Sequence, residues 1–324
     1  MMHYLVTGGA GFIGSHLCDA LLAAGHKLTV VDDLSTGHRS NLSQDVAFIE
    51  GDCGDRSIIK PLMQEVDGVF HLAAIASVQR SREQWFDTSM TNQMATVALL
   101  EAIKHSGRTI PFVYASSAAV YGDPDESLMP LQETTPMEPL TPYGADKAGC
   151  ELHANVAAHV FGVPTIGLRF FNIFGPRQDP SSPYSGVISI FVNRISNDES
   201  VTIFGDGEQT RDFVYVADVV EHLNAAMQGL HTSSITAGSV FNVCGGRTVS
   251  VNQLADVIAE VCGVTAKKEY NEPRVGDIRY SQGDNAKATQ ALGVKATIAL
   301  KDGLKQTVDW MRGYDNASQA EKKA

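Results

Sequence analysis

The fold is decided by the stretch HYLVTGGAGFIG, residues 3–14. Residues with strand propensity lead into a glycine run that satisfies GxxGxxG from Gly8 and GxGxxG from Gly9. Glycines at this place permit a tight turn and let a pyrophosphate approach the amides at the start of the following helix, while Gly14 lets that helix pack closely on the strand. The stretch therefore predicts a strand, a phosphate-binding turn and a helix.

A carboxylate at the end of the second apolar run strengthens this prediction. Asp32 lies 18 residues beyond Gly14, where a carboxylate accepts hydrogen bonds from the adenosine ribose hydroxyls. It repels a 2′-phosphate, Asp33 adds to that repulsion, and Arg39 is the first cation that follows. NAD is therefore favoured over NADP, and the alternative is a glycine turn that binds no dinucleotide. Asp52 after the third strand either meets the adenine edge or caps a helix.

Short apolar runs alternate with helical patterns over the first two-thirds of the chain. The runs lack strict polar–apolar alternation, which is typical of strands covered on both faces. The predicted strands are His3–Thr7, Leu28–Asp32, Val46–Glu50, Gly68–Leu72, Phe112–Ala115 and Thr165–Phe170. The predicted helices between them include Ile13–Ala24, Thr91–Lys104 and Tyr143–Phe161. This order predicts an α/β fold of the Rossmann type, with a doubly wound parallel sheet.

After Asn172 the pattern becomes irregular, and we expect a smaller lobe that is interwoven with the first domain. Residues 175–185 are rich in Pro, Ser and Asp and predict a loop. The later predictions are a helix at Val187–Ile195, a strand at Val201–Phe204, a strand and then a helix within Phe213–Met227, a strand at Val240–Val243 and a helix at Val251–Val261. The expected NAD-binding domain is 1–172 with 213–245 returning to it, the substrate lobe is 173–212 with 246–314, and the polar tail 315–324 is disordered.

Composition and charge exclude several classes of protein. Hydrophobic residues make up 44% and charged residues 19%, as in ordinary globular proteins, and the net charge of -12 argues against a general binder of nucleic acid. The five cysteines form no CxxC pair, so the sequence predicts free thiols and neither a metal site nor a disulfide framework. It has no signal-peptide pattern and no apolar run of membrane-spanning length, so we expect a cytoplasmic protein.

A catalytic pair is suggested by Tyr143 and Lys147, which follow Pro142 with the spacing of one helix face. An ammonium beside a phenol favours the phenolate and lowers its pKa. Such spacing is frequent by chance, and the alternative is a surface tyrosine beside a solvated lysine. The strand Phe112–Ala115 runs into Ser116 and Ser117, and ligands bind at the carboxyl edge of a parallel sheet. A Ser117 hydroxyl at that edge can share a substrate oxygen with Tyr143.

These motifs resemble those of the extended short-chain dehydrogenase/reductase family, and specifically its nucleotide-sugar epimerases, from about Tyr4 to Trp310. The motifs are the glycine run, His71-Leu72-Ala73-Ala74, Asn92, the triad Ser117, Tyr143 and Lys147, Arg169-Phe170-Phe171-Asn172, Gly205-Asp206-Gly207 with Arg211-Asp212-Phe213, and Arg274-Val275-Gly276-Asp277. The resemblance implies that Tyr143 takes the proton of the sugar 4-hydroxyl while hydride from carbon 4 passes to NAD. Ser117 then orients the hydroxyl, and Lys147 lowers the tyrosine pKa and binds the nicotinamide ribose. The 4-keto sugar turns over and the hydride returns to its other face, so NAD stays bound.

The resemblance also assigns contacts and an assembly. The cofactor contacts are Gly8, Gly11, Phe12, Ile13, Gly14, Asp32, Asp33, Ser35, Thr36, Gly37, Asp52, Cys53, Leu72, Ala73, Ala74, Asn92, Tyr143 and Lys147. The UDP-sugar contacts are Ala76, Ser117, Tyr143, Asn172, Val187, Phe204, Arg211, Arg274, Asp277 and Ser281. Asn172, Arg211 and Arg274 are implied to meet the diphosphate, Asp277 the nucleotide ribose and Phe204 the uracil. A homodimer through a four-helix bundle of 91–104 and 143–161 is implied, and burial of those helices on the chain's own sheet is the alternative.

The residues after Ser117 bear on the reaction. Relatives that dehydrate or decarboxylate carry an acidic residue at this place, whereas Ala118 and Ala119 stand here, which favours plain epimerisation. Ala76 and Ser281 are small and leave room for a 2-acetamido group, and FGPRQDP at 174–180 resembles the subgroup that accepts N-acetylated sugars.

We therefore expect interconversion of UDP-N-acetylglucosamine and UDP-N-acetylgalactosamine, with weaker action on UDP-glucose and UDP-galactose, in polysaccharide biosynthesis. The alternatives are a UDP-glucuronate 4-epimerase, a reductase or decarboxylase of the same fold, and a catalytically silent NAD-binding scaffold, against which the intact triad argues.

Overall fold

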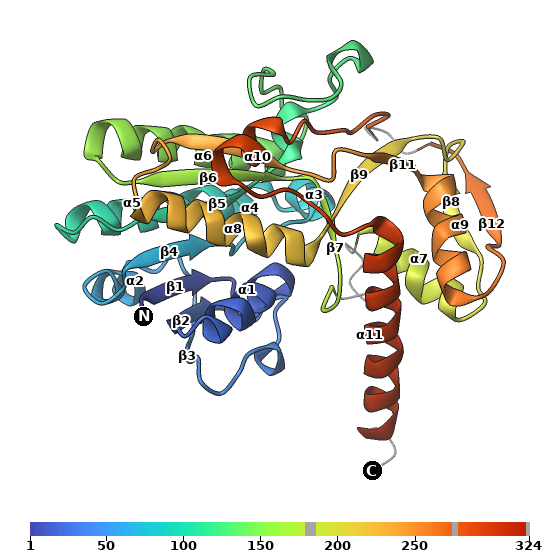
Figure 1. Cartoon of the computed structure of the whole chain (residues 1–324), viewed down its shortest axis with the longest axis horizontal. Coiled ribbons are helices and arrows are strands. Elements are labelled where there is room, and N and C mark those ends of the chain that lie inside the picture. The colour runs from blue at the N-terminus through green and yellow to red at the C-terminus, as the bar shows by residue number, and fades with distance from the viewer. Residues whose placement is uncertain (179–185, 274–277, 322–324) are drawn as a thin grey trace.

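The computed structural model describes residues 1–178, 186–273 and 278–321 (Figure 1). Its centre is a seven-stranded sheet in the order β10-β6-β5-β4-β1-β2-β3, with every neighbouring pair parallel. The strands are β1 (His3–Thr7), β2 (Lys27–Asp32), β3 (Ala47–Glu50), β4 (Gly68–His71), β5 (Phe112–Ser117), β6 (Thr165–Phe170) and β10 (Ser239–Val243). The predicted Rossmann-type sheet is confirmed, and the strand predicted at Val240–Val243 does rejoin it beside β6.

Helices cover both faces of this sheet, because its strands are apolar on both sides. One face carries α1 (Phe12–Ala23), α8 (Val216–His231) and α10 (Ala286–Leu292), with Leu17 and Leu223 in the shared core (Figure 1). The other carries α2 (Arg56–Leu62), α5 (Ala95–His105) and α6 (Pro142–Phe161), whose core includes Leu99 and Ala154. The apolar side chains of both layers are buried, and the free energy of that burial holds the strand ends, and hence the loops after them, in fixed positions.

A smaller lobe lies beside the sheet, at the right of Figure 1. It consists of the strands β7 (Asn172–Phe174), β8 (Val201–Phe204), β9 (Thr210–Tyr215), β11 (Thr248–Ser250) and β12 (Lys268–Asn271) with the helices α7 (Val187–Ser196), α9 (Val251–Cys262) and α11 (Leu300–Glu321). The strands form a three-stranded sheet, β11-β9-β7, and a parallel pair, β12-β8. Phe174, Phe191 and Leu254 lie in its core.

Several predicted boundaries need correction. The strand predicted to end at Ala115 continues to Ser117, because residues 112–117 all pair with β6. The helix predicted at Thr91–Lys104 begins as a π-helical turn, Met90–Met94, and becomes α5 at Ala95. The short helices α3 (Val78–Glu83) and α4 (Trp85–Ser89) precede that turn.

The expected disorder of the tail 315–324 is wrong for residues 315–321, because α11 continues to Glu321. The segment 315–321 contains neither proline nor glycine, so nothing in it breaks a helix that is already formed. Residues 322–324 lie outside the described part of the chain. Of the predicted loop 175–185, only 175–178 are described.

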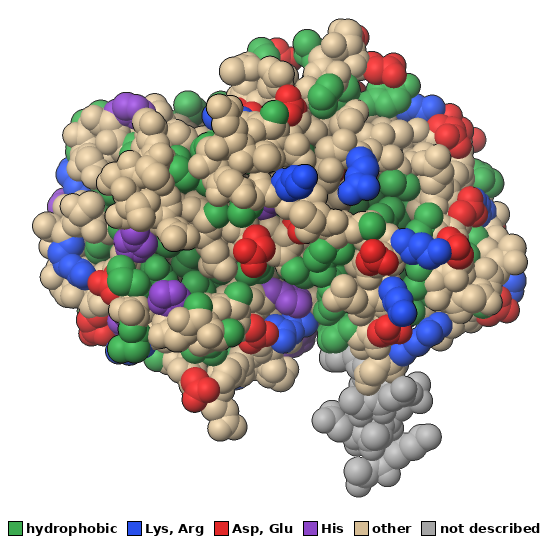
Figure 2. Space-filling view, in the orientation of Figure 1, with side chains coloured by type: hydrophobic (Ala, Val, Ile, Leu, Met, Phe, Trp, Pro, Cys, Tyr) green, Lys and Arg blue, Asp and Glu red, His purple; other side chains and the backbone are tan. Residues whose placement is uncertain are grey.

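The surface and the cysteines agree with the acidic, globular character of the sequence. Figure 2 shows acidic and basic side chains interspersed on one face of the described chain, without a large basic area. Four cysteines are buried, Cys262 is half-buried, and all five are free thiols. Within the described residues, no helix combines the length and the apolar character needed to cross a membrane, and no cluster of His, Cys, Asp or Glu side chains is arranged to hold a metal ion.

Candidate active site

The glycine run forms the turn between β1 and α1 at the carboxyl edge of the sheet. Gly8 has φ +70°, and a Cβ there would lie 2.6 Å from the Ala73 nitrogen, so only glycine fits beside the loop that follows β4. A Cβ on Gly14 would lie 2.1 Å from the Gly8 carbonyl oxygen. The N-cap of α1 is Gly11, which has no side chain to accept hydrogen bonds from the first amides of the helix. These amides can therefore donate to an anion.

Asp32 ends β2 next to this turn. Its carboxylate is buried and accepts hydrogen bonds from the Ala10 and Leu34 amides, both at 2.9 Å. Burial raises its pKa, against the effect of those two donors. Each carboxylate oxygen keeps a lone pair for a further donor, so the carboxylate is fixed beside the glycine run and can accept ribose hydroxyls.

The neighbouring predicted cofactor positions surround Asp32. Asp33 accepts hydrogen bonds from the Ser35 amide at 2.9 Å and hydroxyl at 2.6 Å, which folds the loop that continues through Thr36 and Gly37. Arg39, the first cation, donates to the Leu42 carbonyl at 3.2 Å and lies 5.0 Å from the Phe48 ring centroid. Arg39 is thus engaged with Leu42 and Phe48 and not directed at a 2′-phosphate, which agrees with the expectation of NAD over NADP.

Asp52 does not cap a helix, because the N-cap of α2 is Asp55. Asp52 is exposed and accepts a hydrogen bond of 2.7 Å from the Gly54 amide. The Cys53 thiol is buried in the core, and burial raises its pKa to about 12. The Cys53 side chain is therefore part of the core and not a reactive thiolate.

Asn92 lies in the π-helical turn before α5 and is buried. Its side chain accepts from the Ile75 amide at 2.8 Å and donates to the Ile75 carbonyl at 3.3 Å and to Asp146 at 3.4 Å. Asn92 therefore fixes the loop after β4, which holds Leu72, Ala73, Ala74 and Ala76, and joins it to α6. π-helical turns are frequent at functional sites.

The triad is assembled from β5 and α6. Lys147 is buried, donates a hydrogen bond of 2.8 Å to the Ala115 carbonyl, and lies with Nζ 5.9 Å from the Tyr143 ring centroid. Ser117 is the last residue of β5, and its hydroxyl accepts from the Ala119 amide at 3.1 Å. The alternative of a solvated lysine is therefore excluded by the burial of Lys147.

Two local features fix the start of α6 against the segment that follows Ser117. Thr141 caps the helix through a 3.0 Å bond from the Gly144 amide, and Pro142 occupies its first turn. A Cβ on Gly144 would lie 2.5 Å from the Ala119 carbonyl oxygen, so the helix approaches residues 118–121 as closely as backbone allows. Tyr143 is held beside the end of β5 as a result.

The predicted substrate positions lie on the smaller lobe and the loops that face it. Asn172 begins β7 opposite Phe213, Phe204 ends β8, Val187 begins α7 and Arg211 lies on β9. Phe204, Arg211 and Asn172 are half-buried, as is Ser281, whereas Ala76 is exposed. Arg274 and Asp277 lie outside the described residues.

Asp212, which follows Arg211, positions the Ser281 segment. It is fully buried and accepts hydrogen bonds from the Gly245, Gly246 and Gly283 amides at 2.6, 3.0 and 3.2 Å. Burial raises its pKa to about 7 although these donors act in the opposite direction.

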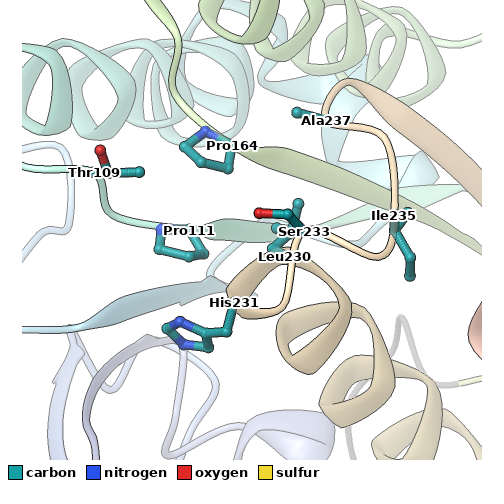
Figure 3. A pocket seen from close by; sticks show the side chains of 8 residues that line it. All are labelled: Thr109, Pro111, Pro164, Leu230, His231, Ser233, Ile235 and Ala237. Atoms are coloured by element: carbon teal, nitrogen blue, oxygen red, sulfur yellow. The ribbon is translucent and has the colours of Figure 1, made fainter.

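A cavity of about 360 Å³ lies elsewhere, at the opposite edge of the sheet (Figure 3). Pro111 and Pro164, which line it, precede β5 and β6, and His231 ends α8. This places the cavity at the amino edge of the strands, away from the glycine turn and the triad. This cavity therefore does not coincide with the predicted site, whose polar groups converge at the carboxyl edge of the sheet.

The comparison with known families agrees with this geometry. Residues 4–244 match the NAD dependent epimerase/dehydratase family, and the chain belongs to that family. The resemblance predicted from the motifs is confirmed, and with it NAD as the cofactor. The family name covers dehydratases as well as epimerases, so membership does not by itself choose the reaction.

Three solved structures show how far the likeness extends. The UDP-glucose 4-epimerase of Thermotoga maritima, solved with UDP-glucose, is 38% identical with a TM-score of 0.91 and covers 97% of this chain and 99% of its own. A UDP-N-acetylglucosamine 4-epimerase from Methanobrevibacter ruminantium, in complex with UDP-N-acetylmuramic acid, is 35% identical with a TM-score of 0.90 and the same coverages. A UDP-glucuronic acid 4-epimerase from Bacillus cereus, in complex with UDP-glucuronic acid and NAD, is 32% identical with a TM-score of 0.87 and covers 97% of this chain and 100% of its own. These proteins are named for different sugars, so the likeness leaves the sugar open.

Sequence reasoning passed over Glu151, which lies beside the predicted triad, and gave Arg169 no role beyond its place in a motif. Glu151 follows Lys147 by one helix turn and forms a buried ion pair with Arg169 of β6. A carboxylate at that spacing among alanines and Cys150 is a signal in the sequence, but its partner becomes evident only from the strand register.

Proposed function

We propose that this chain is an NAD-dependent UDP-sugar 4-epimerase whose preferred pair is UDP-N-acetylglucosamine and UDP-N-acetylgalactosamine. The observation that carries the proposal is the buried Lys147 beside the Tyr143 ring and the end of β5. Both side chains lie at the same sheet edge as the glycine turn, which supports a role for them as an acid–base pair beside the cofactor. The close approaches at Gly8 and Gly14 and the fixed carboxylate of Asp32 fit the pyrophosphate and the adenosine ribose of NAD.

The roles of the side chains follow from their chemistry. The Tyr143 phenolate oxygen accepts the proton of the sugar 4-hydroxyl and later returns it. The Lys147 ammonium, held beside the Tyr143 ring, binds the nicotinamide ribose, and the Ser117 hydroxyl holds the substrate oxygen in place. Bound NAD supplies the redox chemistry, since it can take a hydride from carbon 4 and give it back. Because this cycle involves no net oxidation of the sugar, each turnover regenerates NAD, and the cofactor does not have to be exchanged.

The residues after Ser117 support epimerisation over elimination. The segment 118–121 is a turn of 3₁₀ helix that packs on α6, and it begins with Ala118 and Ala119. Neither can act as an acid or base at the sugar. A dehydratase needs such a group near carbons 5 and 6, because removing a proton from carbon there requires a base.

The preference for N-acetylated sugars rests on the small side chains of Ala76 and Ser281. Ala76 is exposed in the loop fixed by Asn92, and Ser281 is half-buried in the segment fixed by Asp212. Small residues at both places leave volume beside the sugar for a 2-acetamido group. The similar protein from Methanobrevibacter ruminantium, which is named for UDP-N-acetylglucosamine, supports this choice.

UDP-glucuronate 4-epimerase is the second candidate, since the similar protein from Bacillus cereus is named for that substrate. A sugar carboxylate requires a cation or several donors to offset its charge. Ala76 supplies neither a cation nor a side-chain donor, and Ser281 supplies a single hydroxyl, so these two positions favour the uncharged acetylated sugar.

The test is to incubate the purified protein, without added NAD, with UDP-N-acetylglucosamine, UDP-glucose and UDP-glucuronate separately. Proton NMR of the anomeric signals then follows each epimer. We expect the fastest conversion for the acetylated sugar and slower conversion of UDP-glucose. Equal rates for the acetylated and plain sugars contradict the role of Ser281, fastest conversion of UDP-glucuronate favours the second candidate, and a strict need for added NAD contradicts tight retention.

We further propose that the protein is a homodimer formed through α6 and the segment Trp85–Met94. One face of α6 packs on the sheet through Cys150, Ala154 and Ala157. The opposite face exposes Leu152, Val156 and Val160, and the neighbouring segment exposes Trp85, Phe86, Met90 and Met94. An exposed apolar surface of this extent on adjoining helices is typical of an interface.

A further inference from the structure

A buried network of hydrogen-bonded side chains joins β5 and α6, the two elements that carry the predicted triad. Glu151 of α6 accepts a hydrogen bond from the Ser116 hydroxyl at 2.5 Å through Oε1. It forms a bidentate pair with Arg169, with Oε1 2.9 Å from Nε and Oε2 2.7 Å from Nη2. Ser116 and Arg169 lie opposite each other in the β5–β6 register, and the side chains of the ion pair are each 5% exposed.

The network continues from Arg169 to residues 282–284, which adjoin Ser281 and the expected sugar pocket. Arg169 Nη1 donates to the Tyr121 hydroxyl at 2.8 Å, and that hydroxyl donates to Asn242 Oδ1 at 2.7 Å. Asn242 Nδ2 donates to the Leu131 carbonyl at 2.8 Å. Leu131 pairs with the neighbours of Ser281, because its amide donates to the Gln282 carbonyl and its carbonyl accepts from the Asp284 amide, both at 2.8 Å.

The location of this network in the fold is more informative than its contribution to the free energy of unfolding. A buried ion pair is often no more stable than a well-packed apolar pair of the same volume, since desolvation offsets the attraction. Its place is informative, because Ser116 immediately precedes Ser117 and Glu151 lies one turn beyond Lys147. The bonds Lys147–Ala115 and Glu151–Ser116 therefore join successive turns of α6 to successive residues of β5.

We propose that Ser116, Glu151 and Arg169 are positioning residues, which set Ser117 against Tyr143 and Lys147 and, through Tyr121 and Asn242, set the segment 282–284 against the sugar. This inference rests on the proposed epimerase function. Lys147 must serve the chemistry, so a bond independent of Lys147 is needed to hold α6 at a fixed distance from β5. Small misplacements of reacting groups cost large factors in rate.

Substitutions at the two ends of the network, Ser116 and Tyr121, are expected to have different kinetic effects. Ser116→Ala removes the bond to β5 and leaves the Glu151–Arg169 pair intact, so we expect kcat to fall by about tenfold or more with KM changed less than about twofold. Tyr121→Phe removes the link toward 282–284, so we expect KM for the UDP-sugar to rise by about fivefold with kcat changed less than about twofold.

Thr165→Val is the matched control. The Thr165 hydroxyl is buried and also joins a strand to α6, through a 3.1 Å bond to the Ala154 carbonyl, but at the opposite end of the sheet. Retained NAD per protein and the unfolding midpoint are measured for all three variants together with kcat and KM. We expect all three to retain NAD and to unfold at similar midpoints, while only Ser116→Ala and Tyr121→Phe change the kinetics.

The outcomes separate this inference from the proposed function. Ser116→Ala as active as Thr165→Val overturns the positioning role, and so does a loss of activity that merely follows a loss of stability or NAD. Unchanged KM in Tyr121→Phe overturns the extension to 282–284. A wild-type protein that retains NAD but converts none of the UDP-sugars overturns the proposed function, and this inference with it.

Discussion

The Lys147 ammonium donates a hydrogen bond of 2.8 Å to the carbonyl of Ala115, two residues before Ser117 on β5. This contact explains why a long basic side chain is buried in an acidic protein. The carbonyl dipole partly offsets the cost of desolvating the ammonium, while the Tyr143 ring lies 5.9 Å from Nζ. A lysine held in this way can act on the phenol of Tyr143 and on a ligand at the sheet edge together.

Substitutions in this pair are expected to separate chemistry from binding. Tyr143→Phe removes the proton acceptor and keeps the ring, so turnover should fall by about 10²- to 10⁴-fold while NAD retention and UDP-sugar affinity stay near wild type. Lys147→Met should lose turnover and also part of the bound NAD. Steady-state rates, calorimetric binding of UDP-sugar and cofactor content distinguish the two, and a Tyr143→Phe protein with wild-type turnover contradicts the mechanism.

Cofactor choice is expected to depend chiefly on the Asp32 carboxylate. Asp32→Asn leaves an amide that can accept one backbone N–H but no longer repels a 2′-phosphate, so the preference for NAD over NADP should narrow by about tenfold, as loss of one charged contact implies. Asp45→Asn is the matched control, because this exposed carboxylate accepts a hydrogen bond only from the Ser43 hydroxyl among the described contacts and belongs to no predicted cofactor contact. Competition titrations with both dinucleotides measure the change. Equal effects in the two variants contradict the role given to Asp32.

Acid stability is expected to depend on His71. This side chain is buried between the Thr7 and Thr96 hydroxyls, at 2.7 and 3.0 Å. Burial, with a smaller effect of the Lys147 charge, lowers its pKa to about 3. The unfolded chain binds a proton near its ordinary pKa of 6.5, so stability is fully present above that pH and is lost as the pH falls toward 3.

At pH about 4.5 this loss amounts to about 3 kcal/mol. Urea unfolding at neutral and acid pH should therefore show a smaller acid loss for His71→Gln than for wild type, even though the variant is less stable at neutral pH. His105→Gln, at the exposed end of α5, should keep the wild-type loss. Identical acid losses in His71→Gln and wild type count against this account.

The proposed dimer is expected to dissociate when its apolar surface is charged. Val156 and Leu152 are 46% and 60% exposed on one face of α6, and burying two unpaired carboxylates in an interface is costly. The double variant Leu152→Glu, Val156→Glu should sediment as a monomer at micromolar concentration. Val264→Glu changes a valine that is 41% exposed after α9 and should leave the dimer intact. A wild-type protein that sediments as a monomer disproves the dimer outright.

Most of the large sheet could be predicted from the sequence. β1, β6 and β8 match their predicted ranges, because each is a short apolar run between turn-forming residues. The glycine turn after β1 and the position of Asp32 at the end of β2 could also be predicted, and so could the shared helix face of Tyr143 and Lys147, since spacing along one strand or one helix determines spacing in space. Their roles in binding and catalysis stay predictions.

The parts that escaped prediction depend on contacts between distant segments. β7, β11 and β12 have three or four residues each and are defined by their partners. The π-helical turn at Met90–Met94 has no local signal, and the pair of Glu151 and Arg169 arises from the β5–β6 register and the packing of α6. The extent of α11 was underestimated because polarity alone does not end a helix.

In the proposed mechanism, the hydrogen on carbon 4 of the sugar is removed as hydride and returned within one site, while only the hydroxyl proton passes through Tyr143. The most direct measurement is to epimerise UDP-N-acetylglucosamine in deuterium oxide with protein that carries only its retained NAD. NMR and mass spectrometry of the recovered sugars then report carbon-bound deuterium. We expect an equilibrium mixture of the two epimers with no deuterium on carbon 4. Deuterium incorporated at carbon 4 would rule out direct hydride return.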